Sequence, residues 1–420
     1  MMTAPGRRPG RTAGAHGPGA TSGRRGEWAM AATDQGARRY RVISGDGHLE
    51  IPPDPWIRHV PEEHRDRAPR LIALREGGHG WIVEGSPLIH NGQNVTAGRP
   101  VKVRGGSYWE PDGTPFPGTG DAAQRLREQD QDGLDAEVLY PPVFISRFIE
   151  NIEDREAYVA MVRAYNDFLT QDYCSVAPDR LLGNAIIPSS GIEDAIAELK
   201  RVEGLGAAGV YLSSFPAGGG TPAPEDDAFW HAALELGMPI ALHAGLGVRN
   251  NPLLAESAKG KFSLEWSLLG RTNNVATAAI VRMILDGVFD RIPELQVYFA
   301  EANASWIPSA LFMVDDSYGV FKEWYGADLA MKPSEYAWTH CHFGIVRDPV
   351  AMQMKHLLHL DRIMWGSDFP HSVGSFPESR QWIDEIFAPC TDEERRTILV
   401  ENPCRYFGLD PDATLTPTPA

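Results

Sequence analysis

The feature that most constrains the fold of this chain is a repeated alternation of short apolar runs with helical patterns. Eight runs of β-branched or apolar residues recur from Tyr40 onward, and amphipathic stretches such as Ile192–Gly204 and Val275–Phe289 lie between them. Because alternating strands and helices form a parallel sheet wrapped by helices, eight such units predict an α/β fold of the (β/α)8 TIM barrel type. The predicted strands are Tyr40–Gly45, Ala136–Tyr140, Leu181–Ile187, Gly209–Ser213, Ile240–His243, Gln296–Ala300, Trp338–Phe343 and Arg362–Gly366.

One stretch departs from this alternation. Residues 70–121 are too long for a loop between a strand and a helix, and their Gly-Gly, Asn-Gly and Asp-Gly pairs predict β-hairpins. Because this insertion follows the first strand, it is expected over the C-terminal mouth of the barrel, where active sites are built. We expect a lid or small β subdomain in which Trp81, Tyr108 and Trp109 either face a substrate or form the core of the hairpins.

The two ends of the chain have compositions typical of disorder. Residues 1–38 are rich in Gly, Ala, Pro and Arg with almost no aliphatic side chains, and residues 413–420 are mostly Thr, Pro and Ala. We therefore predict a disordered basic leader over 1–38, one large barrel over 39–412, and a disordered tail over 413–420.

The charge of the chain limits its partners. The net charge is −17, and since the residues through Arg39 carry +5, the remainder carries −22. Such a balance argues against a nucleic-acid surface, which needs clustered cations, and no run approaches the roughly 18 apolar residues of a membrane span. The four cysteines form no C-x-x-C pair. We expect a cytoplasmic protein with a small-molecule substrate, without nucleic acid or membrane as partners, that can form a homo-oligomer.

Side chains that can bind a metal gather at the predicted strand ends. Asp46, His48 and Glu50 occupy alternate positions at the end of the first strand and so point the same way, while His243 ends the fifth run and Asp368 follows the eighth. Because the C-terminal ends of barrel strands surround one mouth, Asp46, His48, His243 and Asp368 are predicted to bind one divalent metal ion. Zinc is the first expectation, with manganese or iron as alternatives. Such an ion activates water or polarises a substrate oxygen.

Other polar residues near these strand ends are candidate substrate contacts. His340 and His342 lie two residues apart on the predicted seventh strand and share one face, which is either the barrel lumen or a packed, hydrogen-bonded face. His371 follows Asp368 by three residues, so it can support the ligand carboxylate or act on the substrate. The candidates for substrate binding are Glu50, Trp81, Trp109, His340 and His342, and His371 is a candidate catalytic residue.

Several of these segments together resemble one enzyme family. The segments are D-G-H-L-E followed by P-P-D-P-W, then D-G-L-D-A-E-V-L-Y, H-A-G, F-A-E-A-N-A-S-W-I-P and W-G-S-D-F-P-H. From about Val42 to Leu409 the chain is similar to the amidohydrolase-related family, metal-dependent (β/α)8 enzymes that include aminocarboxymuconate-semialdehyde decarboxylase. The resemblance implies that Asp46 and His48 occupy the H-x-H metal positions of the first strand. It also assigns metal binding to His243 and Asp368, in agreement with the strand-end argument.

The chain departs from that family at one position. The decarboxylases typically carry a catalytic histidine at the end of the sixth strand, and this chain has Glu301 there. Asp46, Asp368 and Glu301 would bring three negative charges beside one divalent ion, which disfavours a substrate carboxylate unless Glu301 is neutral. Glu301 is therefore the candidate general acid or base.

These residues support three hypotheses of function. The first is metal-dependent hydrolysis, or the reverse dehydrative cyclisation, of a small aromatic or carboxylated substrate by a metal-bound water or a metal-polarised oxygen. The alternative is nonoxidative, metal-dependent decarboxylation of an aromatic or enoic acid. The third is a barrel that binds a small molecule without turning it over.

Overall fold

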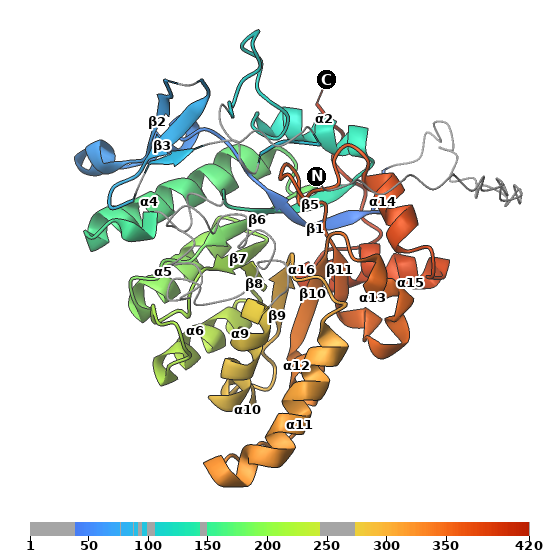
Figure 1. Cartoon of the computed structure of the whole chain (residues 1–420). Coiled ribbons are helices and arrows are strands. Elements are labelled where there is room, and N and C mark those ends of the chain that lie inside the picture. The colour runs from blue at the N-terminus through green and yellow to red at the C-terminus, as the bar shows by residue number, and fades with distance from the viewer. Residues whose placement is uncertain are drawn as a thin grey trace, which may run out of the picture. The chain divides into compact units, whose positions relative to one another are not determined.

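A computed structural model describes residues 38–75, 77–86, 88–90, 95–98, 106–142, 149–243 and 274–419. Its central element is a sheet of eight parallel strands (Figure 1). The strands follow one another in the order β1 (Ile43–His48), β5 (Ala136–Tyr140), β6 (Leu181–Ile186), β7 (Gly209–Leu212), β8 (Ile240–His243), β9 (Val297–Ala300), β10 (Cys341–Ile345) and β11 (Ile363–Trp365). Almost every residue of these strands is buried, as expected for parallel strands covered on both faces.

The sheet closes on itself to form the predicted TIM barrel. The backbone N–H of His48, at the end of β1, donates to the carbonyl of Phe369 at 2.7 Å, and the N–H of Asp368 donates to the carbonyl of Asp46 at 2.9 Å. These bonds join the first strand to the chain that follows the last. Inside the barrel, the Tyr298 hydroxyl of β9 reaches Gly45 of β1, where a Cβ atom would lie only 2.6 Å from it. The lumen is therefore filled by side chains rather than hollow.

Helices surround the strands because their apolar residues recur at helical spacing. In the helix α5, for example, Ala195, Leu199 and Val202 are buried at positions i, i+4 and i+7. The helices are α1 (Asp54–Ile57), α2 (Ala122–Asp132), α4 (Arg155–Asp167), α5 (Ile192–Gly204), α6 (Asp227–Glu235), α9 (Asn274–Leu285), α10 (Val288–Arg291), α11 (Ile307–Tyr325), α12 (Pro333–His340), α13 (Pro349–Gln353), α14 (Ser379–Ile386), α15 (Asp392–Arg396) and α16 (Asn402–Phe407). Among the described residues, no helix combines the length and apolar character needed to cross a membrane.

The insertion after β1 contains a small antiparallel sheet of three strands, β2 (Arg70–Ala73), β3 (His79–Ile82) and β4 (Ile89–His90). A later part of the same insertion reaches the barrel mouth, since the N–H groups of Thr96 and Ala97 each lie 3.0 Å from the carbonyl of Pro370. This part of the insertion therefore lies at the mouth of the barrel.

Two sequence-based expectations need correction. Residues 413–419 are not a tail without structure: Leu415 is buried, its N–H donates to the carbonyl of Arg38, and the N–H of Thr416 donates to Asp179. The seventh strand begins at Cys341 rather than Trp338, because residues 338–340 complete α12. The predicted leader lies outside the described residues except for Arg38, which bonds to Asp130 and Asp135.

Candidate metal centre

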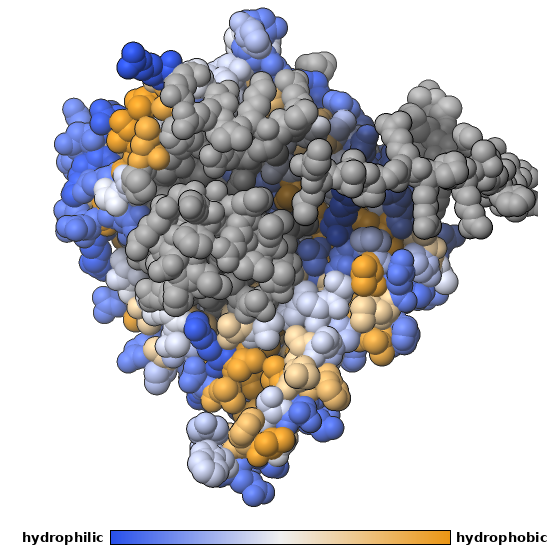
Figure 2. All heavy atoms as spheres, viewed as in Figure 1, coloured by the Kyte–Doolittle hydropathy of each residue, from blue (hydrophilic) through white to orange (hydrophobic). Residues whose placement is uncertain are grey.

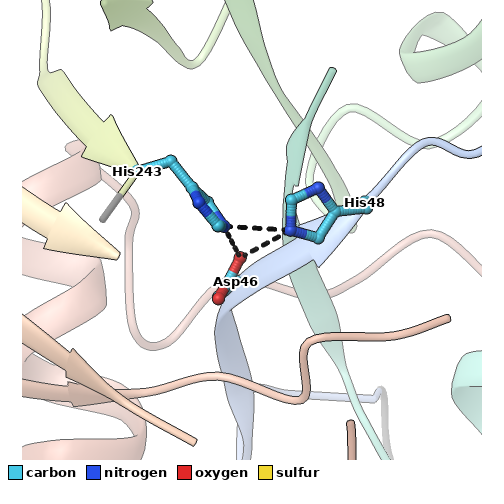
Figure 3. A group of neighbouring side chains, drawn as sticks. All are labelled: Asp46, His48 and His243. Atoms are coloured by element: carbon cyan, nitrogen blue, oxygen red, sulfur yellow. Dashed lines mark hydrogen bonds and ion pairs between the residues drawn. The ribbon is translucent and has the colours of Figure 1, made fainter. Parts of the chain in front are cut away.

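Three of the predicted metal ligands converge at the C-terminal ends of two strands. Asp46 and His48 come from β1 and His243 from the last position of β8, and their side chains point toward one another (Figure 3). The Nε2 atoms of His48 and His243 are 3.0 Å apart, and Asp46 Oδ1 lies 3.5 Å from each of them. The register of parallel strands brings these side chains together although 195 residues separate the two histidines.

Asp368 and His371 extend this cluster on the side of β11. Asp368 Oδ1 lies 3.4 Å from His48 Nε2 and 2.9 Å from His371 Nδ1. The other ring nitrogen of His371 is 3.1 Å from Glu50 Oε1, and its ring stacks on His48 with the ring centroids 3.9 Å apart. His371 therefore orients Asp368, as a residue that supports a metal ligand does, and Glu50 holds His371.

The donor set fits a cation. Among the described residues, neither carboxylate oxygen of Asp46 has a hydrogen-bond partner, and neither does Asp368 Oδ2, although all three are buried. Asp46 Oδ1 has only the two histidine nitrogens 3.5 Å away, and buried carboxylate oxygens with no closer partner are costly. Ligand atoms about 2.1 Å from a tetrahedrally coordinated ion lie about 3.4 Å from one another, which matches most of the separations within the cluster. Asp46, His48, His243 and Asp368 could thus hold one divalent ion.

The protonation of the histidines follows from their surroundings. Burial, assisted by the neighbouring His371 and His243, lowers the pKa of His48 well below its usual value, so the ring stays in the neutral form that binds metals. Burial opposes protonation of His243 and His371 as well, but nearby carboxylates outweigh it. Asp46 chiefly raises the pKa of His243, and Asp368 and Glu50 raise that of His371 well above its usual value.

Glu301 lies at the end of β9, beside His243. Its Oε2 is 3.8 Å from His243 Nε2, and its backbone has a φ of +52°, a left-handed conformation that is uncommon for a residue with a side chain. Asp368 shares this conformation, with a φ of +53°. Burial, together with the charge of Asp368, raises the pKa of Glu301 to about 7. Strained backbone at two strand ends and a carboxyl group that can titrate near neutrality are both typical of an active site.

A buried ion pair that the sequence did not reveal holds the ends of β1 and β11. Arg125 of α2 donates to Glu137 at 2.8 Å, to the carbonyl of His48 at 3.0 Å and to the carbonyl of Phe369 at 3.2 Å. Both charged side chains are almost fully buried. Arg125 therefore fixes the backbone on either side of the metal-binding cluster. The apolar neighbours of Arg125 on the buried face of α2, Ala122 and Leu126, were the available signal in the sequence.

Gly366, in the W-G-S-D-F-P-H segment, makes room for Asp46. A Cβ atom on Gly366 would lie 2.4 Å from the Cβ of Asp46 and 2.9 Å from its backbone nitrogen. The segment that carries Asp368 thus also requires a glycine for the close approach of β1.

The aromatic side chains of the insertion differ in exposure. Trp81 and Tyr108 are buried, and the Trp81 Nε1–H donates to the Tyr108 hydroxyl at 2.6 Å, so this pair lies within a core. Trp109 is half-buried and its ring lies 5.1 Å from that of His79. Of the three, Trp109 retains a surface that a substrate could contact.

The structure places His340 and His342 away from the cluster. His340 ends α12, where its ring stacks on Phe289 and its Nδ1 lies 2.8 Å from the carbonyl of Leu295. His342 lies near the start of β10, at the opposite end of the barrel from the strand ends that carry Asp46, and contacts Arg362 at 2.9 Å. The shared strand face predicted for them does not exist, because the helix extends to His340.

Known sequences that resemble this chain indicate its family. A family model described as amidohydrolase matches residues 112–409. A 2-amino-3-carboxymuconate-6-semialdehyde decarboxylase of Dictyostelium discoideum is 22% identical over 377 residues, which cover 89% of this chain and 94% of the relative. A 4-sulfomuconolactone hydrolase of Hydrogenophaga intermedia is 44% identical over 54 residues, only 11% of this chain and 18% of the relative.

Solved structures share the fold. An amidohydrolase from Mycobacterium avium subsp. paratuberculosis superposes with a TM-score of 0.68 at 20% identity, covering 89% of this chain and 100% of its own. A dihydroxybenzoic acid decarboxylase from Polaromonas sp. JS666, with bound manganese and the inhibitor 2-nitroresorcinol, gives a TM-score of 0.58 at 17% identity, covering 88% and 97%. At these identities the likeness establishes the barrel and its arrangement.

Proposed function

This chain belongs to the amidohydrolase family, and from that premise we propose that it is a metal-dependent carboxy-lyase that removes the carboxyl group of an aromatic or enoic acid without oxidation. The sequence favoured hydrolysis over this alternative. The order is reversed here because the relative that matches over most of its length is a decarboxylase, and so is the manganese-containing structural neighbour.

The metal would be held by Asp46, His48, His243 and Asp368. Because this set mixes nitrogen and oxygen donors, it suits zinc, manganese or iron. A divalent ion bound there would polarise a substrate oxygen and offset negative charge. His48 contributes a neutral ring to this set, and His371 keeps Asp368 oriented through the 2.9 Å contact. These residues position a substrate acid at the barrel mouth.

The observation that carries the proposal is the position of the Glu301 carboxyl group, whose Oε2 lies 3.8 Å from Nε2 of the predicted metal ligand His243. In decarboxylation the bond between the ring or alkene carbon and the carboxyl carbon breaks, carbon dioxide leaves, and a proton must take its place on the remaining carbon. Burial and the charge of Asp368 raise the pKa of Glu301 to about 7, and a bound cation would lower it, so this carboxyl group can hold and release the proton. A protonated Glu301 also removes one of the three negative charges that would repel a substrate carboxylate.

The insertion supplies the outer wall of the proposed substrate site. Residues 95–97 pair with the backbone around Pro370 and His371, directly after Asp368. A substrate would bind beneath this segment, with Trp109 as the aromatic contact and Glu50 acting through His371. We propose that the insertion serves as a lid that excludes water from the site.

Hydrolysis of a lactone or amide is the second candidate, and dehydrative cyclisation is its reverse. Two observations favour it: a carboxylate in place of the family's usual histidine, and the local match to a lactone hydrolase. In that reaction an ionised Glu301 would accept a proton from the attacking water. The two reactions thus require opposite protonation states of one residue.

The test is a substrate panel offered to the protein loaded in turn with zinc, manganese and iron(II). Hydroxybenzoates, aminobenzoates and enoic acids are expected to release carbon dioxide in equal amount to the decarboxylated product. Turnover of lactones or amides without carbon dioxide would replace the first candidate with the second. Glu301→Gln, which preserves size but cannot donate a carboxyl proton, is the matched control. Tight binding of an acid, with no product formed from any of these substrate classes, would support the third hypothesis, a barrel that binds a small molecule without turning it over.

A further inference from the structure

The hydroxyl of Tyr298 lies inside the barrel, in a space that two glycines provide. Tyr298 is the second residue of β9 and is fully buried. A Cβ atom on Gly45 of β1 would lie 2.6 Å from this hydroxyl, and one on Gly344 of β10 would lie 2.4 Å from it. The ring carbon that bears the hydroxyl would be farther away, at 3.4 and 3.1 Å, so the glycines make room mainly for the hydroxyl. A larger residue at either position would collide with it.

The ring of Tyr298 helps to fill the lumen, but its hydroxyl is not needed for that packing. Hydrophilic residues cover much of the described surface in Figure 2, where water can satisfy them, whereas the buried Tyr298 has no such access. Its hydroxyl forms no hydrogen bond with the described residues. Phenylalanine would fill the lumen with the same ring, while a buried hydroxyl without a partner costs free energy. The hydroxyl is therefore expected to serve a group nearby.

The charged group beside this hydroxyl is Asp46. It directly follows Gly45, at a point where the register of β1 against β5 slips by one residue, between Ser44 and Gly47. Irregularities of this kind redirect side chains and are frequent beside active sites. Burial and the charge of Asp46 raise the pKa of Tyr298 well above its usual value, as expected for a phenol close to a carboxylate. Tyr298 and Asp46 thus approach each other inside the barrel.

Only one carboxylate oxygen of Asp46 faces the histidines of the cluster. Asp46 Oδ1 lies 3.5 Å from the Nε2 atoms of His48 and His243, whereas the other oxygen, Oδ2, points away from them (Figure 3). Oδ2 is buried and has no hydrogen-bond partner among the described residues. When a carboxylate binds a metal through one oxygen, a hydrogen bond to the other oxygen fixes its orientation. Asp46 therefore needs a donor, and a phenol hydroxyl is one.

We propose that Tyr298 is a positioning residue of the metal centre, and that its hydroxyl donates to Oδ2 of Asp46. The two groups form no direct hydrogen bond in the structure, so one bridging water would complete the contact. Held in this way, the carboxylate keeps Oδ1 directed at the position that His48 and His243 share. The proposal rests on the metal centre of the proposed function, but not on which reaction the centre performs.

Tyr140 carries the other buried hydroxyl near this site that lacks a hydrogen-bond partner among the described residues. It ends β5, and its ring lies 5.2 Å from the ring of His243 and 5.9 Å from that of His48. Packing against these rings accounts for the position of Tyr140. Tyr298 is the better placed donor, because its hydroxyl reaches the residue next to Asp46.

The test is the metal affinity of the full-length protein, measured for zinc and for manganese by competition with a chelator. Tyr298→Phe should weaken metal binding about 10- to 100-fold. The urea midpoint of the metal-free protein should stay the same or rise in this variant, because a buried hydroxyl without a partner is removed. A role in folding alone would instead lower the midpoint and leave the affinity unchanged. Tyr165→Phe removes a buried, unpartnered hydroxyl of α4, and as the matched control it should keep the wild-type affinity.

A second measurement asks whether the effect passes through Asp46. Asp46→Asn replaces Oδ2 by an NH2 group, which cannot accept a hydrogen bond. In that background Tyr298→Phe should change the metal affinity by no more than about twofold, because the interaction it removes is already lost.

Four results would overturn the proposal. Wild-type metal affinity in Tyr298→Phe, or an equal loss with and without Asp46→Asn, would show that the hydroxyl does not act on Asp46. A loss in Tyr140→Phe but not in Tyr298→Phe would assign the donor to Tyr140. A wild type that binds no divalent ion would refute the metal centre itself, whereas a metal-binding wild type that Tyr298→Phe leaves unaffected would refute only the role of Tyr298.

Discussion

The two ends of the barrel both contain buried polar side chains, but these side chains are paired differently. At the C-terminal mouth, buried carboxylate oxygens of Asp46 and Asp368 have no hydrogen-bond partner among the described residues. At the N-terminal end, Arg362 donates to Gln296 at 2.8 Å and to His342 at 2.9 Å, and the Tyr406 hydroxyl donates to the carbonyl of Ile240.

Two atoms at the N-terminal end also lack a hydrogen-bond partner among the described residues, Nδ1 of His342 and Nε of Arg362, although Arg362 Nε lies 3.5 Å from Asp361 Oδ2. Burial, with the charges of Arg362 and Arg405, lowers the pKa of His342 to about 3, so this ring is neutral. An unpartnered neutral nitrogen costs far less than an unpartnered carboxylate. The comparison indicates that the N-terminal end is built for stability, whereas the mouth keeps buried carboxylate oxygens whose charge a bound cation would offset.

The largest difference between the ends is expected in turnover. Glu301→Gln at the mouth removes the group that transfers the proton and should lower kcat by about 10²- to 10⁴-fold. His342→Gln at the other end should leave kcat close to the wild-type value. Steady-state rates on the substrate found in the panel, with metal content measured for each variant, provide the check. Equal losses in the two variants would mean that the ends do not differ in role.

Stability should respond strongly at the mouth as well. Arg125→Met leaves Glu137 as a buried, unpaired charge and should lower the free energy of unfolding by about 3–5 kcal/mol. Arg362→Met, at a partly exposed arginine, should cost only about 1–2 kcal/mol. Urea denaturation of both variants measures the difference. A smaller loss for Arg125→Met than for Arg362→Met would contradict the assigned role of the ion pair.

A more moderate effect is expected for the residue that orients Asp368. His371→Ala removes the contact to Asp368 Oδ1 and should weaken metal binding about 10- to 100-fold. Competition with a chelator of known affinity measures the dissociation constant, and His342→Gln again serves as the comparison. Unchanged metal affinity in His371→Ala would assign His371 to the substrate instead.

The smallest effect, but the one that separates the two reactions, is on the pH profile. If Glu301 donates a proton, activity is highest below its pKa of about 7 and falls tenfold per pH unit above it. If Glu301 accepts a proton, activity rises with pH through the same region. A bound cation moves this limb to lower pH without reversing its direction. The limb should disappear in Glu301→Gln, and its persistence would assign it to another group.

The sequence predicted the barrel well because strand ends are marked by local signals. Ala136–Tyr140 and Ile240–His243 are strands with the predicted bounds, and Ile192–Gly204 is a helix with the predicted bounds. The approach of Asp46, His48, His243 and Asp368 was also predictable, because the carboxyl ends of barrel strands share one mouth. Local patterns are enough to predict which residues meet here, because every residue at the C-terminal end of a barrel strand lies at the same mouth.

The errors arise where contacts between distant residues decide the structure. Residues 338–343 pass from α12 directly into β10 with no glycine or proline between them, so sequence alone could not separate helix from strand. Leu415 lies in a polar, Pro-rich segment typical of disorder, yet it is buried and bonds to Arg38. Ala122 and Leu126 mark the buried face of α2 that carries Arg125, but they do not identify its partner Glu137, which lies on a different element. None of these contacts leaves a periodic signal.

The measurement that tests the account most directly is the metal content of purified protein beside Asp368→Ala and His342→Gln. Asp368 contributes one of the four side chains that converge at the mouth, whereas His342 lies at the other end of the barrel. We predict one divalent ion per chain in the wild type and in His342→Gln, and a clear loss in Asp368→Ala. Equal metal content in the wild type and Asp368→Ala would contradict the assignment of the metal centre.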